Sequence, residues 1–181
     1  MQLHLGCGRS HLAGWVNCDY IPSPTADLVF DVQDPWPIKD ETATAIYASH
    51  MLEHLTRPHD FFREAWRVLI PNGQMLIRVP FGGSRLAWCD LTHIRPWFAE
   101  TFCMLQPGYS DSTGNPQHDE WTAFFGISVA QHRVRAELAP VLRSWWRRRL
   151  LVPWLRYMTE SVQELHVHLF GLATAVPRAC Q

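Results

Sequence analysis

The chain of 181 residues has almost no excess of charge of either sign, with 16 Lys and Arg residues against 17 Asp and Glu. Because a near-neutral protein has no global field that attracts nucleic acid, we expect no nucleic-acid partner. The sequence also lacks an apolar run near the roughly 20 residues that a membrane-spanning helix needs, and its N-terminus shows no signal-peptide pattern. We therefore expect a cytoplasmic protein.

Two common site signatures are missing as well. The five cysteines are odd in number and show no Cys-x-x-Cys spacing, which argues against a disulfide framework and against a cysteine zinc cluster. The dinucleotide fingerprint Gly-x-Gly-x-x-Gly, with an acid about 20 residues further on, is also absent. This disfavours a nicotinamide dehydrogenase.

A glycine turn followed by an acid is the most informative feature that is present. Residues 3–8 read Leu-His-Leu-Gly-Cys-Gly, and residues 16–20 read Val-Asn-Cys-Asp-Tyr after a short link. The pattern is typical of a buried strand, a turn, and a second strand that ends in an acid. Glycines let the backbone approach a ligand closely, and a carboxylate at the strand end accepts hydrogen bonds from ribose hydroxyls. The stretch therefore indicates a site for a nucleoside cofactor.

Downstream, apolar runs of strand length alternate with a helical pattern. Apolar residues recur at three- and four-residue spacing over 58–69, which predicts an amphipathic helix. This alternation favours a parallel sheet covered on both faces, with ligands bound beyond the carboxyl ends of the strands. Further strands are predicted at 27–31, 45–49, 74–79, 121–129 and 164–173, a short helix at 96–105, and a loop of lid-like length at 106–120.

Taken in order, these segments resemble a class I S-adenosylmethionine-dependent methyltransferase, in particular the small predicted methyltransferases linked with cell-surface polysaccharide genes. The resemblance runs from the glycine motif through the fifth strand and is thin beyond about residue 106. The matching segments are Leu5-Gly-Cys-Gly8, Gly14-Trp-Val-Asn-Cys-Asp19, Asp27-Leu-Val-Phe-Asp31, residues 46–55 and 64–80, and Asp90-Leu-Thr-His-Ile-Arg-Pro96.

The resemblance implies one α/β domain over residues 1–181, with a Rossmann-like, mostly parallel sheet of seven strands. The implied strand order is 3-2-1-4-5-7-6, with the last strand antiparallel and helices on both faces. Residues 3–80 would form the cofactor-binding half, and residues 81–181 the substrate-side loops and last two strands. The first crossover is shortened: only about seven residues separate Gly8 from Val16, which by itself favours a hairpin or tight loop. The parallel pairing of the first two strands thus depends on the resemblance.

The implied cofactor is S-adenosyl-L-methionine. Asp19 is assigned to the ribose, and the alternative is an ordinary acid at a strand end. Asp31 and Val32 are assigned to the adenine, and the alternative for Asp31 is a helix or turn cap. Without a first helix, Arg9 or backbone amides of the short link would hold the methionine carboxylate. The full predicted cofactor set is Leu5, Gly6, Cys7, Gly8, Asp19, Tyr20, Asp31, Val32 and Ser49.

Three residues are candidates for catalysis. His50 follows the fourth strand, where it would face the methyl donor and act as a base. Asp90 and His93, three residues apart, suit a base oriented by an acid, although an Asx turn or helix cap explains the same spacing. His50 and His54 are four residues apart, but the order is not His-Glu-x-x-His and no third ligand is evident, so we expect no metal.

We therefore predict an enzyme that moves a methyl group to a hydroxyl or amine of a small molecule or glycan intermediate. The alternative is a non-catalytic protein of the same fold that binds a cofactor or a partner. Tryptophans and arginines interleave over residues 142–157. This segment fits either a peripheral contact with the inner face of the membrane or an ordinary packed helix with its arginines extended to water.

Overall fold

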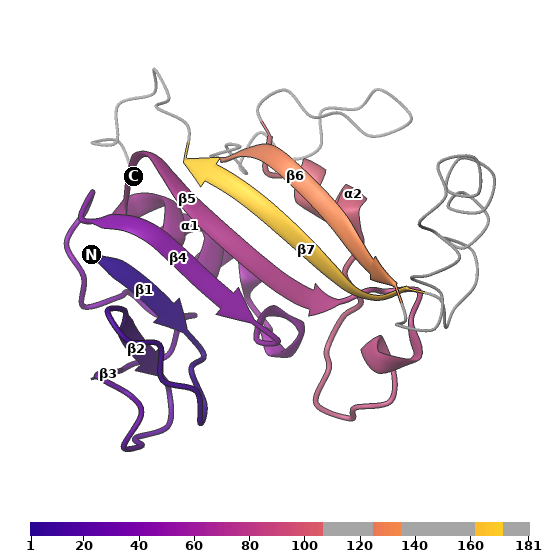
Figure 1. Ribbon diagram of the computed structural model, residues 1–181, viewed down its shortest axis with the longest axis horizontal. Helices are drawn as coiled ribbons and strands as arrows, with labels where there is room; N and C mark the ends of the chain where they lie inside the picture. The colour runs from indigo at the N-terminus through magenta and orange to yellow at the C-terminus, as the bar shows by residue number, and fades with distance from the viewer. Residues whose placement is uncertain (107–124, 135–161, 172–181) are drawn as a thin grey trace.

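Seven strands form one sheet in the order β3-β2-β1-β4-β5-β7-β6 (Figure 1). The structure is a computed structural model that describes residues 1–106, 125–134 and 162–171. The elements are β1 (Gln2–Leu5), β2 (Val16–Asp19), β3 (Leu28–Val29), β4 (Ala43–Ser49), the 3-10 helix η1 (Leu52–His54), α1 (Pro58–Val68), β5 (Leu69–Pro80), the 3-10 helix η2 (Arg85–Ala87), α2 (Ala99–Cys103), β6 (Phe125–Val134) and β7 (Val162–Gly171). Strand β7 is antiparallel to both of its neighbours, and the other pairings are parallel. The predicted order and direction of the strands are confirmed.

The link between β1 and β2 makes a parallel connection without a helix. Leu3 pairs with Val16 in parallel register, and residues 6–15, all of which the structure describes, contain no α-helix and no 3-10 helix. The buried amide of Asn17 organises the link instead. Its Oδ1 accepts a hydrogen bond from the Leu12 amide at 2.9 Å, and its Nδ2 donates to the carbonyls of Leu12 and Trp15 at 3.2 and 3.0 Å. Of the two connections that the short link alone favoured, a hairpin or a tight loop, the parallel pairing rules out the hairpin.

Helix α1 follows the predicted amphipathic pattern and starts with a proline in its first turn. Its apolar side chains, among them Phe61 and Phe62, are buried against the sheet. Helix α2 is shorter than the predicted 96–105, because Trp97 forms a β-bridge with Phe81 and so holds the chain extended just before the helix. Both α helices lie behind the sheet as viewed in Figure 1, and within the described ranges no α helix covers the near face.

Several predicted boundaries shift. The strand expected at 27–31 is reduced to Leu28–Val29, and the strand expected at 74–79 extends to Leu69–Pro80. The turn at Pro71-Asn-Gly73 becomes an excursion inside β5, where Asn72 has a φ of +63°. Residues 107–124, most of the expected loop, and residues 142–157 lie outside the described ranges. None of the helices described is long and apolar enough to cross a membrane.

A buried carboxylate fastens the chain before β4 to helix α1. Glu64 accepts hydrogen bonds from the Trp36 amide at 2.8 Å and from Arg67, whose Nη2 lies 2.7 Å from Oε2. Burial by itself raises the pKa of Glu64, but the hydrogen bonds from Arg67 and Trp36 outweigh it and the net pKa is lowered. Glu64 therefore stabilises the fold as a carboxylate.

This lowered pKa predicts an acid-sensitive contribution to stability. The unfolded chain protonates Glu64 near the ordinary value of 4.5, whereas the folded chain keeps it ionised to lower pH. Its stabilisation is thus complete above that pH and is lost as the pH falls through the lowered folded-state pKa. In urea unfolding, Glu64→Gln should cost about 1–3 kcal/mol at pH 7 and progressively less below pH 4.5. Exposed Glu100→Gln is the control, and a cost independent of pH would contradict the assignment.

Candidate active site

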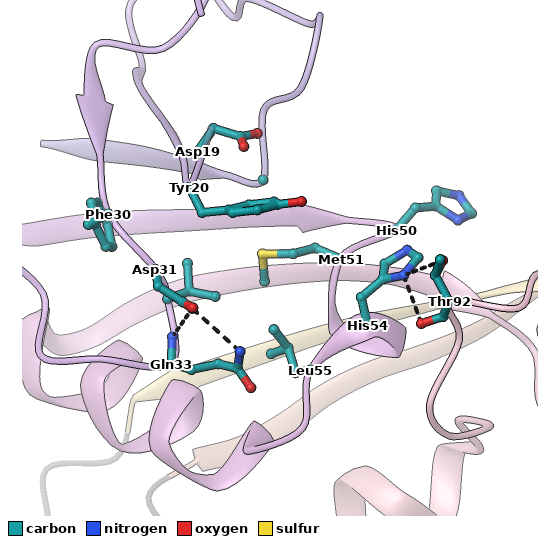
Figure 2. A pocket seen from close by; sticks show the side chains of 12 residues that line it. Asp19, Tyr20, Phe30, Asp31, Gln33, His50, Met51, His54, Leu55 and Thr92 are labelled. Atoms are coloured by element: carbon teal, nitrogen blue, oxygen red, sulfur yellow. Dashed lines mark hydrogen bonds between the residues drawn. The ribbon is translucent and has the colours of Figure 1, made fainter. Parts of the chain in front are cut away.

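A cleft of about 500 Å³ opens where the parallel strands β1 to β4 end. Figure 2 shows the side chains of Asp19, Tyr20, Asp31 and Met51 around it, with His50 and His54 at one end. The lining residues are Gly6, Asp19, Tyr20, Phe30, Asp31, Val32, Gln33, His50, Met51, His54, Leu55 and Thr92. The cleft lies where parallel α/β sheets bind their ligands.

The glycine turn forms one wall of this cleft. Gly6 and Gly8 have φ values of +64° and +53°, in the left-handed region that favours glycine. A Cβ atom on Gly6 would lie 2.9 Å from the Cγ of Met51, so the turn also packs tightly on the residue that follows β4. Cys7 is buried, its amide donates to the Cys18 carbonyl at 3.0 Å, and burial raises the pKa of its thiol. Cys7 thus acts as a small neutral residue in the turn.

Gly6→Ala should weaken nucleoside binding as well as the fold. The new methyl group has to displace Met51 into the cleft, and alanine is strained at this φ by about 1–2 kcal/mol. We expect an approximately tenfold higher Kd for S-adenosylhomocysteine by calorimetry. The matched control is Gly14→Ala, also at positive φ but with open space around it, which should leave this Kd unchanged. Equal effects of the two variants would show that backbone strain alone is responsible.

The two strand-end acids have different surroundings. Asp19 is buried to 7% exposure, and its two oxygens accept hydrogen bonds from the Gly8 amide at 2.7 Å and the Ile21 amide at 3.0 Å. Asp31 is exposed, and its Oδ1 accepts a hydrogen bond from the Gln33 amide at 2.8 Å in an Asx turn (Figure 2). Both carboxylates keep acceptor capacity toward the cleft, since each oxygen has two lone pairs.

His50 lies between two carboxylates at the end of β4. Its Nδ1 is 3.4 Å from Glu53 and its Nε2 is 3.5 Å from Glu164. Glu53 raises the pKa of His50 against the opposing effect of burial. Burial also raises the pKa of Glu164, but hydrogen bonds from His166 and Arg78 outweigh it and lower that pKa to about 2. The backbone of His50 has a φ of +51°, which is uncommon outside glycine and typical of a functional turn.

A second pocket, of about 550 Å³, adjoins the cleft through His50. Its other lining residues come from η2 and from the loop that follows it: Leu86, Cys89, Asp90, Leu91 and His93. His50 is the residue that this pocket and the cleft share. The arrangement can hold two ligands on either side of one imidazole.

The predicted Asp90–His93 pair is close but not hydrogen-bonded. Asp90 Oδ2 lies 3.9 Å from His93 Nε2, while Asp90 Oδ1 accepts hydrogen bonds from the amide and hydroxyl of Thr92. The bond from the Thr92 amide closes the Asx turn that was the alternative explanation of the spacing. Both bonds lower the pKa of Asp90. The same His93 Nε2 lies 4.0 Å from a carboxylate oxygen of Glu53. Glu53 is buried, whereas Asp90 is exposed. Sequence reasoning gave Glu53 no role.

The structure brings together only part of the predicted cofactor set. Five of its nine members line the cleft: Gly6, Asp19, Tyr20, Asp31 and Val32. The catalytic candidate His50 lines it as well. Four others shape the strands and turn behind it and do not line it: Leu5, Cys7, Gly8 and Ser49. The Gly8 amide is already donated to Asp19. Sequence reasoning missed the apolar lining of Phe30, Met51 and Leu55. Their only signal was their position shortly after β3 and β4, on either side of η1 in the case of Met51 and Leu55.

Comparison with known proteins agrees with this geometry. Residues 3–77 match the family model described as a methyltransferase domain. No curated protein sequence matches the chain significantly. Among solved structures, an S-adenosylmethionine-dependent methyltransferase from Archaeoglobus fulgidus is 15% identical with a TM-score of 0.65, over 93% of this chain and 85% of that one. Another from Mesorhizobium loti is 12% identical with a TM-score of 0.58, over 93% and 89%.

A third similar structure is a complex between the Haloferax volcanii Trm112 methyltransferase activator and the putative methyltransferase. It is 15% identical with a TM-score of 0.57, over 97% of this chain and 83% of that chain. At these identities the structures show the fold, which is the Rossmann-like fold of class I methyltransferases. The predicted resemblance to class I methyltransferases is confirmed, while the link with cell-surface polysaccharide genes stays a prediction. The family match over residues 3–77 agrees with S-adenosylmethionine as the cofactor that the resemblance implies.

Proposed function

We propose that this chain is a methyltransferase that binds S-adenosyl-L-methionine in the cleft and methylates a hydroxyl or amine of a small molecule or glycan in the second pocket. The observation that supports this most directly is the sharing of His50 by the two pockets. In this proposal residues 3–80 supply most of the cofactor site, and residues 81–181 contribute the acceptor side.

The residues of the cleft suit a nucleoside. Asp19 accepts hydrogen bonds from the ribose hydroxyls, while Asp31 and the backbone of Val32 contact the edge of the adenine ring. Phe30 and Leu55 supply apolar surface beside the base. When bound, S-adenosyl-L-methionine would supply an electrophilic methyl group on a sulfonium, from which the neutral thioether is the leaving group. The protein has to orient the acceptor, exclude water and receive one proton.

His50 is placed to receive that proton. An acceptor that takes up the methyl group would pass its proton to the imidazole of His50. Glu53 and Glu164 then stabilise the imidazolium from 3.4 and 3.5 Å. The carboxylates thereby favour the charge that His50 gains during the reaction.

Calorimetry and a transfer assay test the proposal. The full chain should bind S-adenosylhomocysteine with one-to-one stoichiometry and should not bind NADH. Labelled methyl groups should then pass from S-adenosyl-L-methionine to members of a panel of hydroxylated and aminated acceptors, including glycan intermediates. NADH binding without nucleoside-thioether binding would refute the proposal. Cofactor binding with no transfer to any acceptor would favour the non-catalytic alternative.

A further inference from the structure

Three side chains that can bind a metal meet at the boundary of the cleft and the second pocket. Glu53 and His54 come from η1, and His93 comes from the loop after η2. One ligand atom of each lies within 4.8 Å of the other two. The Ile94 amide donates to the Glu53 carbonyl at 2.8 Å, so the loop is fastened to η1 next to the cluster.

The carboxylate of Glu53 is buried with its hydrogen-bonding capacity unused. Its residue is 1% exposed, and among the described residues neither of its oxygens has a hydrogen-bond partner. The nearest nitrogens are those of His50 at 3.4 Å and His93 at 4.0 Å. A buried carboxylate that accepts no hydrogen bond is costly, and the imidazole of His50 at 3.4 Å compensates it only in part. The surroundings of Glu53 therefore favour a cation at this point.

His93 presents its Nε2 toward Glu53 at 4.0 Å, and both histidine rings have a backbone carbonyl at Nδ1. His54 Nδ1 lies 3.2 Å from the Thr92 carbonyl (Figure 2), and His93 Nδ1 lies 3.2 Å from the Ala87 carbonyl. Because a carbonyl only accepts, each Nδ1 carries the hydrogen, and Nε2 of the neutral ring keeps its lone pair. A backbone carbonyl behind each ring is the arrangement that orients metal-binding histidines.

We propose that Glu53, His54 and His93 bind one divalent transition-metal ion of the Zn²⁺ type. Two imidazoles and one carboxylate suit such ions and leave coordination positions open. Ligand atoms around a bound Zn²⁺ lie about 3–4 Å apart, so modest side-chain rotations complete the site. The third ligand, not evident in the sequence, is His93, which the fold brings to Glu53 and His54. This reverses the expectation of no metal.

The position of the ion suggests a role in selecting the acceptor. His54 lines the cleft and His93 lines the second pocket, so the ion lies between the two. A divalent ion held there would make an acceptor hydroxyl more acidic, so that its proton would pass more readily to His50 or to water. This role rests on the proposed function and favours oxygen acceptors over amines. The binding of the ion does not depend on that function.

Metal titration of the full chain, without an affinity tag, tests the site. After chelation and dialysis, the protein should bind one equivalent of Zn²⁺ by calorimetry and one of Co²⁺ with visible d–d absorption. Glu53→Gln, which keeps the side-chain shape, and His93→Gln should each weaken Co²⁺ binding by more than about 100-fold. The matched control is His168→Gln on β7, outside both pockets, which should bind like the parent chain.

The outcomes separate the metal site from the methyltransferase proposal. The site is refuted if no saturable equivalent binds, or if Glu53→Gln, folded by circular dichroism, binds Co²⁺ as the parent does. Where Glu53→Gln does not fold, His54→Gln replaces it with the same expected loss. S-adenosylhomocysteine is titrated into the same metal-free protein. If the nucleoside binds and the metal does not, only the proposal of a metal site is refuted. If the metal binds and the nucleoside does not, only the proposed function is refuted.

Discussion

Asp19→Asn is expected to raise the Kd for S-adenosylhomocysteine by about 30- to 150-fold, a loss of about 2–3 kcal/mol. The carboxylate lines the cleft and is already held by the amides of Gly8 and Ile21, so its remaining lone pairs are fixed toward the ligand. Asparagine removes the charge and turns one acceptor into a donor. Calorimetry on the full chain measures the change.

The matched control for this variant is Asp34→Asn. Asp34 forms an exposed ion pair with Arg57 and does not line the cleft, so its loss should leave the nucleoside Kd unchanged. Thermal unfolding of both variants separates binding from folding, because Asp19 also fastens the glycine turn. An Asp19→Asn protein that is folded and binds the nucleoside as the parent does would remove Asp19 from the ribose site.

Phe62→Ala is expected to cost about 3–5 kcal/mol of unfolding free energy, the second large effect. The Phe62 ring contacts Phe61, Trp97, Phe102 and Phe125, with ring centroids 5.2 to 6.4 Å apart. It therefore joins α1 to the chain around α2 and to β6. Since the free energy of unfolding of a domain is about 5–15 kcal/mol in total, the variant should unfold at a much lower urea concentration than the parent chain.

Leu91→Ala is the comparison for this loss. Leu91 is fully exposed, so its truncation should change stability by no more than about 0.5 kcal/mol. If Phe62→Ala and Leu91→Ala unfold at the same urea concentration, the aromatic cluster does not hold α1 to the sheet.

The fold was predictable where local pattern and family resemblance agreed. Helix α1 and strand β4 follow from apolar spacing, and the strand order follows from the resemblance. The β1–β2 pairing was not predictable from physics alone, because it depends on one amide, Asn17, whose hydrogen bonds replace those of a crossover helix. Nothing in the amino-acid sequence distinguishes that asparagine from an ordinary polar residue of a strand.

The site was predictable where a residue follows a strand end. Asp19, Asp31 and His50 line the cleft for this reason. Glu53 and His93 were harder, because their proximity depends on how the loop after η2 folds back onto η1. His93 was assigned to Asp90 by sequence distance, whereas its ring lies equally near a buried carboxylate from another segment.

The helix-free link has a consequence for the order of folding. Leu3 and Val16 are 13 residues apart, whereas an ordinary β-helix-β unit runs to about 30, so closing this loop costs about 0.7 kcal/mol less. The pairing of Gln74 with Phe170 closes a far longer loop. We therefore expect the glycine turn and Asp19 to form early, well before β7 joins the sheet.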